Sequence, residues 1–77
     1  MFFKPILAGR LAHFSGVPKS VVIRYLRDEL IFPVDKTKAG YPRFSMDTIL
    51  VVKKIRKMEK DGWATRMIKK KMTKQHG

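Results

Sequence analysis

The sequence predicts a single small domain that is mainly α-helical, with about four helices and one two-stranded β hairpin. The chain has 77 residues, which is enough for one domain and too few for two. Apolar residues recur at three- and four-residue spacing in four stretches, which is the period of one helix face. The stretch without that period, residues 33–44, holds two prolines and a glycine, as short strands joined by a turn do.

The first helix is predicted over residues 6–14, because Leu7, Leu11 and Phe14 share one helix face. Ser15-Gly16 ends it, since glycine tolerates the left-handed backbone that a tight turn requires. Within this helix, Ala12 is small enough for a second helix to cross closely.

The second helix is predicted to begin at Pro18, a residue suited to the first helical turn, and to run to about Glu29. Val22, Leu26 and Leu30 recur at four-residue spacing on its inner face. The two helices and the turn between them therefore read as a helix-turn-helix at about residues 6–29.

A two-stranded hairpin is predicted at about residues 31–44, directly after the second helix. Its two prolines favour edge strands, because proline cannot donate to a strand ladder. Lys36, Lys38 and Arg43 make its turn and base positively charged. A basic hairpin in this position is typical of a wing, which adds contacts to the DNA backbone or minor groove.

Two further helices are predicted, at about residues 45–60 and 65–74. Ser45 suits an N-cap, and Asp47 in the first turn complements the helix dipole. Asp61-Gly62 separates the two helices. Trp63 follows the break.

The net charge of the chain limits the classes of partner that we expect it to bind. Eighteen Lys and Arg stand against six Asp and Glu, which gives a formal charge of +12. A compact domain with this charge attracts nucleic acid, an acidic protein surface or an anionic membrane. No apolar run approaches the roughly 20 residues that a membrane span needs. We also expect no membrane partner at the surface, because the apolar stripes of the helices are used by a shared core.

Catalysis and metal binding have no support in the sequence. The chain has no cysteine, and its two histidines, His13 and His76, lie far apart. Asp28 and Glu29 are adjacent, so they point in different directions on a helix. No glycine-rich phosphate loop is present. We therefore expect no enzyme activity, no metal and no cofactor.

The helix-turn-helix and its wing together predict a winged helix-turn-helix domain that binds double-stranded DNA. The second helix is expected to enter the major groove, with long donors reaching base edges. Base-edge contacts are predicted for Lys19 and Arg24, with Ser20 on or near the same face. Phosphate or minor-groove contacts are predicted for Tyr25, Arg27, Lys36, Lys38, Arg43 and Lys60. Tyr41 completes the predicted site, half buried beneath the wing.

Several segments in order resemble the DNA-binding domains of MerR-type regulators. Residues 8–17 are similar to their opening helix and turn, and Leu30-Ile31-Phe32-Pro33 to the exit from their second helix. Residues 40–45 resemble the end of their first wing, and residues 55–65 their second. The resemblance implies a winged helix-turn-helix domain acting in transcriptional control. It also implies that the Trp63 ring packs into the core and that the Tyr25 hydroxyl faces a phosphate.

Two departures bear on that resemblance. The segment Ile23-Arg24-Tyr25-Leu26-Arg27 looks more like the second helix of phage excisionases. The long dimerisation helix and effector domain of MerR-type proteins have no counterpart in these 77 residues, so no small-molecule effector is expected. One alternative is therefore an excisionase or another architectural factor that bends DNA. An alternative of another class is a basic module that docks on an acidic protein or a membrane.

The partner expected on these grounds is duplex DNA. Because one domain reads about one half-site, a second copy of the chain or another DNA-bound protein is a further expected partner. The expected location is the cytoplasm, in association with the nucleoid.

Overall fold

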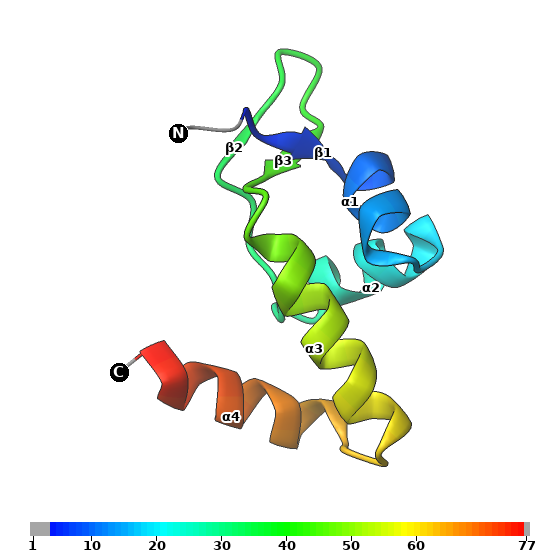
Figure 1. The fold of residues 1–77 in the computed structure, drawn as a ribbon. Coiled ribbons are helices and arrows are strands. Elements are labelled where there is room, and N and C mark those ends of the chain that lie inside the picture. The colour runs from blue at the N-terminus through cyan, green and yellow to red at the C-terminus, as the bar shows by residue number, and fades with distance from the viewer. Residues whose placement is uncertain (1–3, 77) are drawn as a thin grey trace.

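A computed structural model describes residues 4–76 of the chain, and the side chains of residues 4–72. Four helices and three short strands are present in this part of the chain (Figure 1). The elements in order are β1 (Ile6–Leu7), α1 (Ala8–Ser15), α2 (Lys19–Arg27), β2 (Asp35–Lys36), β3 (Pro42–Phe44), α3 (Thr48–Lys60) and α4 (Thr65–His76).

The strands form one antiparallel sheet in the order β1-β3-β2. The predicted wing is confirmed as the β2–β3 hairpin, in which Asp35 lies opposite Arg43. The prediction that residues 6 and 7 begin the first helix is wrong, because Ile6 pairs with Phe44 as a third strand. Helix α1 therefore begins at Ala8, and the wing is joined directly to the helix-turn-helix through β1.

The turn between α1 and α2 follows the sequence prediction. Gly16 has φ of 71°, the left-handed conformation that glycine adopts without steric cost. The Val17 amide donates to the Ala12 carbonyl at 3.1 Å, which satisfies a carbonyl at the end of α1. Pro18 is the N-cap of α2.

Helix α2 ends two residues earlier than predicted. It ends at Arg27, and Glu29 has φ of 59°. The Leu30 amide donates to the Tyr25 carbonyl at 2.9 Å, so the chain closes the helix and turns away. Glutamate thus occupies a backbone conformation that normally favours glycine.

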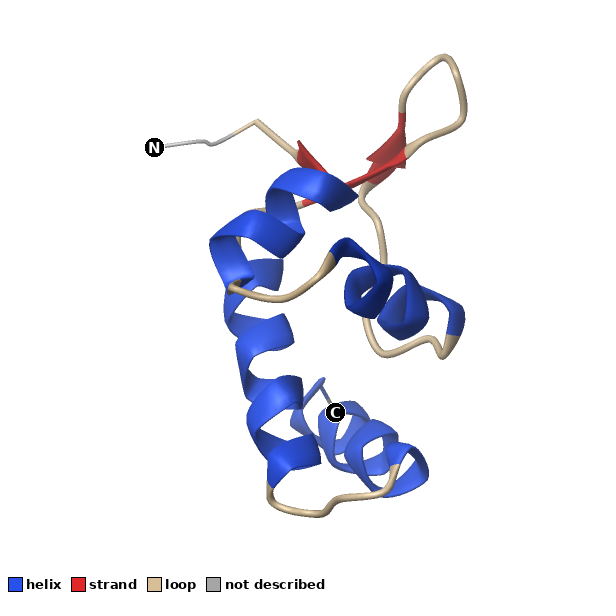
Figure 2. Ribbon diagram, turned by 90° about the vertical axis from the view of Figure 1, so that its right-hand side faces the viewer, coloured by secondary structure: helices blue, strands red, loops and turns tan. Residues whose placement is uncertain are grey.

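Helix α3 runs away from the sheet, and α4 lies across its far end (Figure 2). The prediction that Ser45 caps α3 is wrong: Asp47 is the N-cap, and it makes no side-chain capping bond. The Ser45 hydroxyl lies 3.3 Å from the Thr48 hydroxyl instead. Gly62, with φ of 94°, separates α3 from α4 as predicted.

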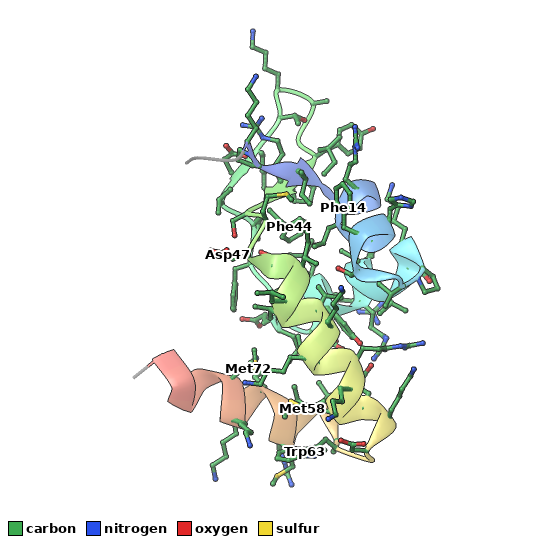
Figure 3. All side chains as sticks on the ribbon, in the orientation of Figure 1. Phe14, Phe44, Asp47, Met58, Trp63 and Met72 are labelled. Atoms are coloured by element: carbon green, nitrogen blue, oxygen red, sulfur yellow. The ribbon has the colours of Figure 1, made fainter. Side chains whose placement is uncertain are left out.

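The core joins α1, α2 and α3 to the sheet and to the start of α4. Its largest fully buried side chains are Leu11, Val22, Tyr25, Phe44, Val52, Ile55 and Ile68. The prediction that Trp63 packs into this core is wrong: it lies at the α3–α4 turn, away from Phe44 (Figure 3). Trp63 is exposed, and the Lys71 ammonium lies 5.1 Å from its ring centre.

Candidate nucleic-acid interface

The outer face of α2 carries a row of exposed side chains one helical turn apart. Lys19, Ile23 and Arg27 are all exposed and follow each other at four-residue spacing. Ser20 is exposed beside Lys19. Arg27 lies 3.9 Å from Asp28, but its side chain is 72% exposed and so free to reach outward. Two cations thus flank one apolar side chain on a face that the core leaves open.

Arg24 does not stand free on this face as the sequence reasoning expected. Its Nη1 and Nη2 atoms donate to the two carboxylate oxygens of Glu59, at 3.0 Å and 3.2 Å. Glu59 lies on α3, 35 residues away in sequence. The guanidinium therefore ties α2 to α3, while 36% of the Arg24 side chain stays exposed and its base contact stays a prediction.

Tyr25 is also placed differently from the prediction. Its side chain is fully buried, and its hydroxyl donates to Glu59 Oε1 at 2.5 Å. A buried tyrosine needs such a partner, because its hydroxyl has lost contact with water. Tyr25 is thus a core residue with no route to a phosphate in this structure.

The charges of this cluster reinforce one another. Burial alone would raise the pKa of Glu59, but hydrogen bonds from Arg24 and Tyr25 outweigh it and lower that pKa. The hydrogen bond to Glu59 raises the pKa of Arg24. Burial, with the Glu59 bond, raises the pKa of Tyr25 to about 12. Glu59 is therefore the anion that holds two α2 side chains in place.

Two cations of the wing are exposed, and a third is paired with a carboxylate. Lys36 and Lys38 are exposed in the hairpin. Arg43 donates from Nε and Nη2 to the Asp35 carboxylate at 2.7 Å and 2.6 Å, which lowers the pKa of Asp35 and raises that of Arg43. Arg43, predicted to contact a phosphate or the minor groove, thus also forms a cross-strand ion pair, which braces the hairpin.

Tyr41 is more exposed than predicted, at 63% of its surface. It lines a shallow groove between the wing, the start of α1 and the start of α2. Leu7, Arg10, Lys19 and Ile23 line the same groove. The sequence prediction did not include Arg10 or Ile23. Ile23 could have been found from the sequence, because it lies four residues after Lys19 and so on the same face of the helix.

Lys60 is exposed at the end of α3, as predicted. Lys53 and Lys57 are exposed on the same helix. In the part of the chain described, no group of three or more metal-ligating side chains occurs. No helix among the described residues has the length and apolar character to cross a bilayer.

Solved structures of two MerR family regulators share this fold. One is HiNmlR, a MerR family regulator lacking the sensor domain, bound to promoter DNA, with a TM-score of 0.73, 16% identity and 87% of this chain covered. The other is a MerR family transcriptional regulator from Bacillus cereus, with a TM-score of 0.77, 20% identity and 91% covered. The match spans 53% and 52% of those chains, about half their length.

A comparison with curated proteins gave no match. The model of the MerR HTH family of regulatory proteins matches residues 8–75, which takes in every element from α1 into α4. The match therefore includes the helix-turn-helix, the wing and the basic helix α3. The chain belongs to the MerR helix-turn-helix family of regulatory proteins.

Proposed function

We propose that the chain binds double-stranded DNA sequence-specifically through α2 and acts in transcriptional control. The observation that carries the proposal is the exposed row of Lys19, Ile23 and Arg27 on a helix whose opposite face is buried. An exposed second helix of this kind fits the major groove. The fold shared with a regulator bound to promoter DNA supports the same function.

Each side chain in this row has a distinct chemistry. The Lys19 ammonium is a donor for guanine O6 and N7, and Ser20 beside it can donate or accept. The Ile23 side chain suits the methyl group of thymine. Arg24, held by Glu59, fixes the orientation of α2 and so acts as a positioning residue.

The residues that contact phosphates in this proposal lie on the wing, α2 and α3, around the exposed row of α2. Lys36 and Lys38 on the wing, Arg27 on α2 and Lys60 on α3 supply exposed positive charge. Tyr41, exposed in the groove beside the wing, suits packing against a deoxyribose. A regulator of this kind works in the cytoplasm at the nucleoid, and a second copy or another bound protein supplies the other half-site.

Binding to different nucleic acids at several salt concentrations tests the proposal. Duplex sites are first selected from a random pool, and fluorescence anisotropy then compares selected duplex, single strand and duplex RNA. We expect selected duplex to bind best, with a slope of log affinity against log salt near −5 if about six phosphates are contacted. Equal binding of the three nucleic acids, or a slope near zero, would contradict the proposal.

A further inference from the structure

A second basic surface lies outside the exposed row of α2. It is a pocket between the α1–α2 turn and the middle and end of α3. The lining residues are Ser15, Gly16, Val17, Lys53, Arg56, Lys57 and Lys60. The turn thus forms one wall, and four cationic side chains form the other.

Ser15 lines this pocket and carries a hydroxyl without a hydrogen-bond partner among the described residues. Its side chain belongs to a residue that is only 8% exposed. Its Oγ is buried and has no hydrogen-bond partner among the residues that the structure describes. A buried hydroxyl without a partner costs about 1–3 kcal/mol, so it is normally satisfied by protein, water or a ligand.

The cations in the pocket are available to a ligand. Lys53, Lys57 and Lys60 follow one face of α3 at spacings of four and three residues. None of the three forms an ion pair with any side chain described in residues 4–72. The carboxylate on this stretch of α3, Glu59, is occupied by Arg24 and Tyr25 and lies 3.9 Å from Arg56.

We infer that this pocket binds a phosphate group, and that the group is a backbone phosphate of the bound duplex. A phosphate oxygen accepts hydrogen bonds from both a hydroxyl and ammonium groups, so it satisfies Ser15 and offsets the lysine charges together. The inference rests on the proposed function. It extends the DNA contact to the turn and to Lys53 and Lys57, which sequence reasoning did not include.

The position of the pocket favours the DNA backbone as the source of the phosphate. Val17, in the pocket wall, lies two residues before Lys19, the first residue of the exposed row. A helix that enters a groove with its first residues has the phosphates of the groove wall beside its N-terminus. Lys60 then contacts the same strand from α3.

Single neutral phosphates in the selected duplex test this inference. Each phosphate is replaced in turn by an uncharged methylphosphonate, and affinity is measured for wild type, Lys57→Gln and the matched control Lys70→Gln. Lys70 is exposed on α4 and does not line the pocket. We expect one phosphate whose replacement weakens wild type and Lys70→Gln by roughly five-fold and leaves Lys57→Gln unaffected.

Ser15→Ala separates this role from a structural one. Removing the unpartnered hydroxyl is expected to leave the melting temperature unchanged or raised, while weakening duplex binding by about two- to five-fold. A loss of affinity that follows a loss of stability would overturn the inference.

The remaining outcomes distinguish a DNA backbone phosphate from free phosphate as the ligand, and failure of this inference from failure of the proposed function. If the duplex binds and Lys19→Ala weakens it, but no methylphosphonate effect disappears in Lys57→Gln, the inference fails and the proposed function stands. If the duplex does not bind, both fail. Amide shifts of Ser15 and Gly16 on titration with inorganic phosphate would then assign the pocket to free phosphate instead, and their absence would overturn any phosphate site.

Discussion

Glu29 shows how a single residue can conflict with the backbone it occupies. It ends α2 with φ of 59°, where a side chain crowds the backbone at a cost of roughly 1–2 kcal/mol. Its carboxylate lies 3.9 Å from the Lys69 ammonium, but both side chains are largely exposed, so the pair contributes little. The strained φ of Glu29 therefore destabilises the fold by more than its ion pair with Lys69 stabilises it.

Glu29→Gly is expected to raise the free energy of unfolding by about 0.5–1 kcal/mol. Glycine removes the strain energy of the positive φ. This gain is larger than the loss of stability from the extra conformational entropy that glycine gives the unfolded chain. Urea denaturation measures the change. Glu29→Ala, which removes the ion pair and keeps the strain, is the matched control, and a glycine variant no more stable than it would contradict the explanation.

Glu59 is the second residue on which the account depends, because it holds both Arg24 and Tyr25. Its pKa is lowered in the folded state, so its contribution to stability is present above its unfolded value, near 4.5, and is lost as pH falls through the folded value. Tyr25 affects stability at alkaline pH, because its pKa is raised from 10 to about 12 in the folded state. The free energy of unfolding therefore falls as pH rises above 10, where the unfolded chain loses the Tyr25 proton first.

Glu59→Gln is expected to cost about 1–2 kcal/mol at pH 7, since a neutral amide cannot replace the charged hydrogen bonds. The difference from wild type should shrink between pH 7 and pH 3, because the stabilising contribution of the charged carboxylate declines as pH falls below its unfolded value near 4.5. Urea denaturation at the two pH values measures this. A difference that stays constant would show that Glu59 acts through packing rather than charge.

At the scale of elements, α2 and the wing are assigned different tasks. The exposed row of α2 lies on a rigid helix packed on α1 and tied to α3 by Arg24. The wing is a short hairpin braced by the Asp35–Arg43 pair, with Lys36 and Lys38 exposed. The first arrangement suits base recognition, and the second suits contacts that are independent of sequence.

Lys19→Ala and Lys38→Ala are expected to differ for this reason. Lys19→Ala should cost roughly 1–3 kcal/mol on the selected site and relax the preference at one base pair. Lys38→Ala should weaken all sequences alike and make the salt slope shallower by about 1. Affinities for the selected site and for its single base-pair variants measure both, and identical profiles would contradict this division of tasks.

The sequence predicts elements better than contacts, and particular residues show why. Gly16 and Pro18 mark the α1–α2 turn with local chemistry, and the structure confirms it. The strand at Ile6 was missed because its partner, Phe44, is distant in sequence. The Arg24–Glu59 pair spans 35 residues and leaves no periodic pattern, so nothing in the sequence indicated that Arg24 ties two helices together.

At the scale of the whole molecule, positive charge is spread over several elements. Exposed lysines lie on α2, on the wing, along α3 and on α4, while the core joins these elements into one body. With a net charge of +12, the domain attracts any polyanion at long range. Specificity must then come from the shape and chemistry of α2 rather than from charge.

Guanine methylation on the selected duplex tests that central claim most directly. Guanine N7 lies in the major groove and adenine N3 in the minor groove, so dimethyl sulfate reports both. We expect bound wild type to protect a central run of guanine N7 atoms, and Lys19→Ala to lose protection at one of them. A tightly bound complex that protects only adenine N3 would show that α2 does not occupy the major groove.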